Sequence, residues 1–71
     1  SIGANYEALG LLEPAAQNYQ EAYTLAYQGA MFNRAAEALQ KLANLFQSSN
    51  QAQQALSVYQ ILVSVNALAK D

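Results

Sequence analysis

Apolar residues recur at helical spacing in four stretches of the chain, and residues that end helices lie between these stretches. In the first stretch, residues 2–9, the apolar or small positions are Ile2, Gly3, Tyr6 and Leu9. This spacing places them on one face of an α-helix. Gly10 follows, and glycine takes the left-handed conformation at a helix C-terminus without steric cost. The pattern therefore predicts a first helix that ends at Gly10.

A second helix is predicted from Pro14 to about Gln28. Proline is favoured in the first turn, where its missing N–H would have no partner, and the Glu13 carboxylate suits the positive end of the helix dipole. The apolar stripe of this helix consists of Ala15, Tyr19, Ala22, Tyr23 and Ala26. Gly29 is expected to stop the helix.

A third helix is predicted to begin near Asn33, because asparagine is a favourable N-cap residue. Its apolar stripe consists of Ala35, Ala38, Leu39, Leu42, Leu45 and Phe46. On the outer side Glu37 precedes Lys41 at the helical i, i+4 spacing, an order that stabilises a helix by about 0.2 to 0.5 kcal/mol. The next predicted break consists of Ser48, Ser49 and Asn50.

The last helix is predicted from about Gln51 to Ala69. Its main stripe consists of Ala52, Ala55, Leu56, Tyr59, Leu62 and Val63. A second apolar set widens the hydrophobic surface well beyond one face, and its members are Val58, Ile61, Val65 and Leu68. A helix that is hydrophobic on most sides is normally buried on most sides. We therefore assign the second set to a surface that meets a neighbouring repeat or a partner.

The chain also matches itself at a shift of forty residues. Residue class is kept where Ile2, Gly3, Tyr6, Gly10, Ala15 and Tyr19 fall on Leu42, Ala43, Phe46, Asn50, Ala55 and Tyr59. A weaker match at twenty residues aligns Ala15 with Ala35 and Ala55. We interpret the shorter interval as successive helices of similar length, with a two-helix hairpin as the repeating unit. Chance identity in a chain rich in alanine and glutamine is the alternative.

The repeated positions form recognisable motifs. The first copy reads Ile2-Gly3-x2-Tyr6, Gly10-x-Leu12, Ala15-x3-Tyr19 and Ala22, and the second reads Leu39-x2-Leu42-Ala43-x2-Phe46 and Ala55-x3-Tyr59. These motifs resemble the tetratricopeptide-repeat pattern of L-G-x2-Y followed by A-x3-F in the second helix. The period of forty is longer than the usual about 34 residues of that family, so the chain resembles its long-repeat variety. HEAT-like helix pairs share the same packing positions.

The resemblance implies an all-α fold in which antiparallel helix hairpins stack as a right-handed solenoid. It implies about two repeats, over residues 1–29 and 30–71, with the first helix of the first repeat truncated. In that family, peptides lie in a concave groove lined by the first helix of each repeat. The matching positions of the second repeat are Glu37, Gln40, Asn44 and Gln47. The family's carboxylate clamp is not expected, because Gln40 stands where a lysine is required.

Charge and composition exclude several function classes. Three basic residues against five acidic ones give a net charge of −2, so the chain lacks the basic cluster that binds nucleic acid or anionic membranes. Without cysteine and histidine, the usual metal ligands and near-neutral acid–base groups are missing. We expect no catalytic site, metal or cofactor. The uncharged part of the last helix is too short and too polar for a membrane span.

These observations predict a non-catalytic protein-binding or scaffold segment. Tyr6, Tyr19 and Tyr59 occupy repeat-core positions and are expected to pack inside. The expected partners are a peptide or protein, and a neighbouring helical repeat or a second copy of the chain at the last helix. Two alternatives stay open: a self-associating bundle that uses the uncharged last helix, and a helical accessory segment of an enzyme.

Overall fold

The computed structural model describes residues 2–4 and 10–70, and its helices confirm the all-α prediction. Helix α2 spans Leu12–Gln28, α3 spans Phe32–Ser48 and α4 spans Ala52–Ala69. Residues 2–4 are also helical, and no strand occurs among the described residues. The rest of the predicted first helix, including Tyr6 and Leu9, lies outside them.

The chain folds with a period of twenty residues. The complete helices begin at Leu12, Phe32 and Ala52. The residue two positions before each start has a left-handed backbone, with φ of 76° at Gly10, 57° at Ala30 and 64° at Asn50. The alanines that match at this interval are all buried, and they are Ala15, Ala35 and Ala55. The interpretation of the twenty-residue match as successive helices of similar length is therefore confirmed.

The two turns between complete helices close with the same backbone hydrogen bond. After α2, the Met31 N–H donates to the Ala26 carbonyl oxygen over 2.8 Å. After α3, the Gln51 N–H donates to the Phe46 carbonyl oxygen, also over 2.8 Å. Such bonds satisfy carbonyl groups at a helix end that would otherwise lack a partner. The turns are thus equivalent although their sequences differ.

One predicted helix end is confirmed and one predicted N-cap is wrong. Helix α2 ends at Gln28 with Gly29 as its C-cap residue, as predicted, and the neighbouring Ala30 takes the left-handed conformation. Helix α3 begins one residue before Asn33, with Met31 at the N-cap and no side-chain cap hydrogen bond. The hydrogen bond from the Met31 N–H to the Ala26 carbonyl oxygen closes this turn. The residue with positive φ directly precedes Met31, and it is therefore Ala30 rather than Gly29. Pro14 lies in the first turn of α2, as predicted.

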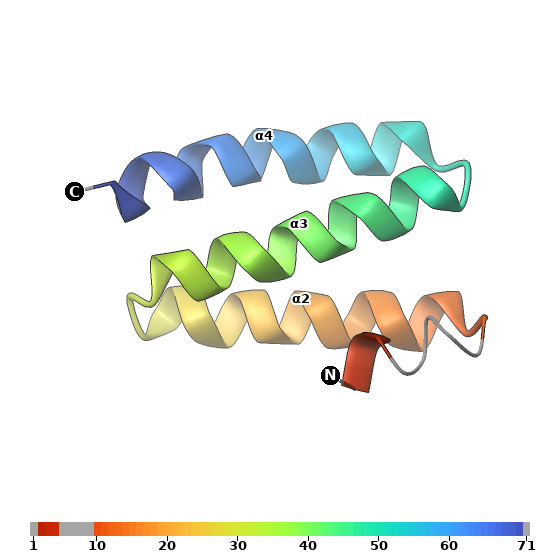
Figure 1. Cartoon of the computed structure of the whole chain (residues 1–71), viewed down its shortest axis with the longest axis horizontal. Helices are drawn as coiled ribbons and strands as arrows, with labels where there is room; N and C mark the ends of the chain where they lie inside the picture. The colour runs from red at the N-terminus through yellow and green to blue at the C-terminus, as the bar shows by residue number, and fades with distance from the viewer. Residues whose placement is uncertain (1, 5–9, 71) are drawn as a thin grey trace.

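The three helices form one antiparallel layer with α3 in the middle (Figure 1). The Cα atoms extend over 36 × 23 × 13 Å. Extensive packing joins α2 to α3 and α3 to α4. A layer of this kind buries side chains between adjacent helices and leaves the far side of α4 without a neighbour among the described residues.

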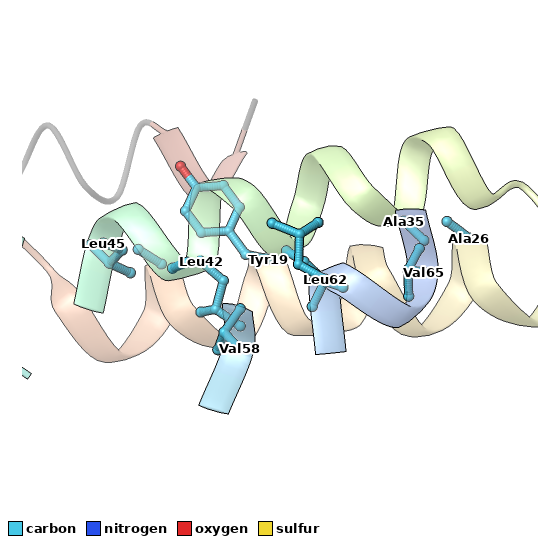
Figure 2. Packing of buried hydrophobic residues seen from close by; sticks show 11 residues of the cluster. Tyr19, Ala26, Ala35, Leu42, Leu45, Val58, Leu62 and Val65 are labelled. Atoms are coloured by element: carbon cyan, nitrogen blue, oxygen red, sulfur yellow. The ribbon is translucent and has the colours of Figure 1, made fainter. Parts of the chain in front are cut away.

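Hydrophobic side chains fill the two interfaces between helices (Figure 2). The buried cluster consists of Ala15, Tyr19, Ala26, Ala35, Leu39, Leu42, Ala43, Leu45, Val58, Leu62 and Val65. The predicted α3 stripe is confirmed, with Phe46 half-buried at its end. Tyr19 is buried as predicted, whereas Tyr59 is only half-buried. Ala22, which was placed in the α2 stripe, is exposed.

Helix α3 carries two apolar stripes because it has two neighbours. The α2-facing stripe consists of Ala35, Ala38, Leu42 and Leu45. Two hollows between α2 and α3 indicate that this stripe faces α2. Ala38 lines one of them together with residues of α2, and Leu45 lines the other together with Leu12. The second stripe, on the side of α3 toward α4, consists of Phe32, Ala36, Leu39 and Ala43, which are buried or half-buried, and the Phe32 ring at its start also lies 5.6 Å from the Tyr27 ring of α2. We call it the α4-facing stripe. Each stripe follows the alternating three- and four-residue spacing of a helix face.

The N-terminal segment contacts α2 at a position without a side chain. Gly3 is buried, and a Cβ atom built there would lie 2.5 Å from the Tyr19 ring. Only glycine lets the backbone approach the aromatic ring this closely.

Candidate protein-binding site

The four predicted groove residues share one exposed face of α3. Glu37, Gln40, Asn44 and Gln47 are all exposed, and their spacing of three and four residues aligns them along the helix. This face is opposite Leu39, Leu42 and Phe46, which point into the layer. The structure therefore brings the predicted residues together, and their role in binding stays a prediction.

The amide groups on this face are partly engaged with one another. The Gln40 Nε2 atom donates to the Asn44 Oδ1 atom over 3.1 Å. The Tyr59 hydroxyl donates to the Gln47 Oε1 atom over 2.9 Å and ties this face to α4. These contacts orient the amides while leaving the Gln40 carbonyl oxygen and the Asn44 amide nitrogen for other partners.

A hollow of about 240 Å³ lies beside this face, between α2 and α3. Its lining includes Asn18 and Ala22 from α2 and the charged residues Arg34, Glu37 and Lys41 from α3. The predicted ion pair between Glu37 and Lys41 does not form, and no ion pair joins any two described residues. Exposed pairs of this kind contribute little to stability, so hydration competes successfully with pairing.

The predicted partner surface on α4 is only partly exposed. Ile61 and Leu68 are each 42% exposed, as a surface role requires. Val58 and Val65 are 7% and 1% exposed, so they do not belong to the surface for a neighbouring repeat or a partner to which the sequence pattern assigned them. Both pack in the core between α3 and α4, where they form the inner stripe of α4 with Ala55 and Leu62.

The exposed apolar residues of α4 include two that the sequence pattern placed inside. Leu56 is 59% exposed and Val63 is 70% exposed. Together with Ala52 and the half-buried Tyr59 they form a second stripe, which we call the outer stripe of α4. Leu56, Tyr59 and Ala52 also border a hollow of about 220 Å³ together with Gln47 of α3.

The twenty-residue period contains the signal that could have identified the outer stripe. Residues twenty positions before the outer stripe are Phe32, Ala36, Leu39 and Ala43, which form the α4-facing stripe of α3. Residues forty positions before it are Leu12, Ala16, Tyr19 and Tyr23, all buried or packed against the core. The outer stripe therefore occupies positions that α2 and α3 use for the next helix in the layer.

A second apolar groove lies on the other side of the layer. It has a volume of about 240 Å³ and runs over α3 between α2 and α4. Leu39, Leu42 and Phe46 form its floor, while Gln20 and Gln54 lie at its borders. Ile61 also lines this groove, so the exposed apolar residues of α4 are divided between two sides of the helix.

Metal-ligand clusters and membrane-spanning helices are absent from the described residues. These residues contain no group of three or more side chains that could hold a metal ion, and no described helix combines the length and apolar character needed to cross a membrane. No buried side-chain nitrogen or oxygen among them lacks a hydrogen-bond partner. Within this part of the chain, the features that call for a functional explanation are the exposed surfaces of α3 and α4.

Comparison of the chain with family models, curated proteins and solved structures gives no match.

Proposed function

We propose that the chain is a non-catalytic protein-binding segment of a tetratricopeptide-like helical repeat, and that it binds through the exposed side of α4. The observation that carries this proposal is the exposure of Leu56 and Val63, at 59% and 70%, on a helix without a charged residue from Ala52 to Ala69. The tetratricopeptide-like assignment is supported by antiparallel helices that follow one another at a constant interval.

The apolar character of this side is unusual for a surface that faces only water. A solvent-facing helix side normally carries charged and polar residues. Each fully buried valine or leucine side chain contributes roughly 1.5 to 3 kcal/mol relative to an exposed one. Covering Leu56 and Val63 with another apolar helix would release this free energy, whereas their present exposure contributes nothing to the fold.

The experiment uses an isotope-labelled chain and a synthetic uncharged helical peptide with leucine at alternating three- and four-residue spacing and glutamine or alanine elsewhere. We expect chemical-shift changes in α4, and we expect the double variant L56Q/V63Q to lose them while its melting temperature stays within a few degrees of the wild type. If binding persists in this variant, or if the variant unfolds, the proposal is wrong.

A self-associating bundle is the rival use of the same helix. Sedimentation of the chain over a wide concentration range separates the two uses. A monomer at every concentration would support binding to a different partner, because the bundle requires the exposed apolar residues of α4 in one copy to pack on those of another. Reversible association that disappears in L56Q/V63Q would instead favour the bundle.

A second candidate function is peptide binding on the polar face of α3. It is favoured by the alignment of Glu37, Gln40, Asn44 and Gln47 beside the hollow between α2 and α3. Amide side chains can hydrogen-bond the backbone of an extended peptide. Replacement of Gln40 and Asn44 by alanine should abolish binding of such a peptide and leave the fold intact. Unchanged affinity would remove this face from consideration.

A further inference from the structure

We draw no further inference here: the strongest candidate, the apolar groove of about 240 Å³ that runs over α3 between α2 and α4, carries none because nothing in the described part of the structure shows what covers it.

Discussion

Helices α3 and α4 are built from the same plan, and they differ in how many neighbours they have. Each carries two apolar stripes at equivalent positions, twenty residues apart. In α3 both stripes are covered, one by α2 and the other by α4. In α4 the inner stripe is covered, while Leu56 and Val63 of the outer stripe are more than half exposed. The comparison shows that position in the layer, rather than local sequence, decides which apolar residues become core.

The two helices also differ on their polar sides. Helix α3 carries Arg34, Glu37 and Lys41 on its exposed face, whereas α4 has no charged residue within its bounds. The charged residues of α3 stay in contact with water, so the remaining sides of this helix are the ones that can be buried. Helix α4 has no charged residue, and packing alone therefore decides which of its sides is buried. An uncharged helix at the edge of a layer is therefore the place where covering by a further apolar surface would cost least.

The largest expected effect compares two tyrosines at equivalent positions. Tyr19→Ala should lower the free energy of unfolding by about 3 to 5 kcal/mol, because a buried aromatic ring is lost from the core. Tyr59→Ala should lower it by less than about 1.5 kcal/mol, because the ring is half-buried and no further helix covers it. Chemical denaturation of both variants measures the difference. Equal losses would contradict the distinction between covered and uncovered stripes.

The second effect compares two valines of α4 that are two residues apart. Val65→Gln should destabilise the fold by roughly 2 to 4 kcal/mol, because the amide is buried without a hydrogen-bond partner at a position only 1% exposed. Val63→Gln should change stability by less than about 0.5 kcal/mol, since its side chain faces solvent. Thermal unfolding of both variants, followed by circular dichroism, measures the two changes in stability. Reversal of this order would show that the inner and outer stripes of α4 are exchanged.

A smaller effect tests the equivalence of the turns. Ala30→Gly should raise the free energy of unfolding by about 0.5 to 1 kcal/mol, because the left-handed conformation at φ of 57° strains alanine and not glycine. The control Ala67→Gly, at an exposed position in the last turn of α4, should lower it by up to about 1 kcal/mol. If both changes destabilise the chain equally, the left-handed geometry at position 30 is not the native one.

The smallest effect concerns the bond between the two helices. Tyr59→Phe removes the hydroxyl that donates to Gln47 and should cost no more than about 0.5 to 1 kcal/mol, since this bond is exposed to solvent. The matched change Gln47→Ala should cost a similar amount. A double-mutant cycle on the two residues measures the coupling. Strictly additive losses would show that the hydrogen bond contributes nothing to the packing of α4 on α3.

The sequence predicted the elements of the fold closely and the candidate site only in part. Helical spacing and turn residues located α2, α3 and α4 to within two residues, because amphipathic helices and left-handed turns leave strong local patterns. The polar face of α3 was identified correctly as exposed. In α4 the pattern placed Leu56 and Val63 inside and Val58 and Val65 outside, which is the reverse of what the structure shows.

The sequence by itself determined the approximate bounds of the helices, the twenty-residue interval between them, the buried face of α3 and most of that of α2, where Ala22 is the exception. It did so because charged and amide side chains oppose burial and so define the other face. Only the tertiary structure decided which of the two apolar stripes of α4 packs on α3. Both stripes are apolar and uncharged, so the local pattern does not distinguish them, and only the packing of α4 on α3 shows that Val58 and Val65 are buried while Leu56 and Val63 are exposed.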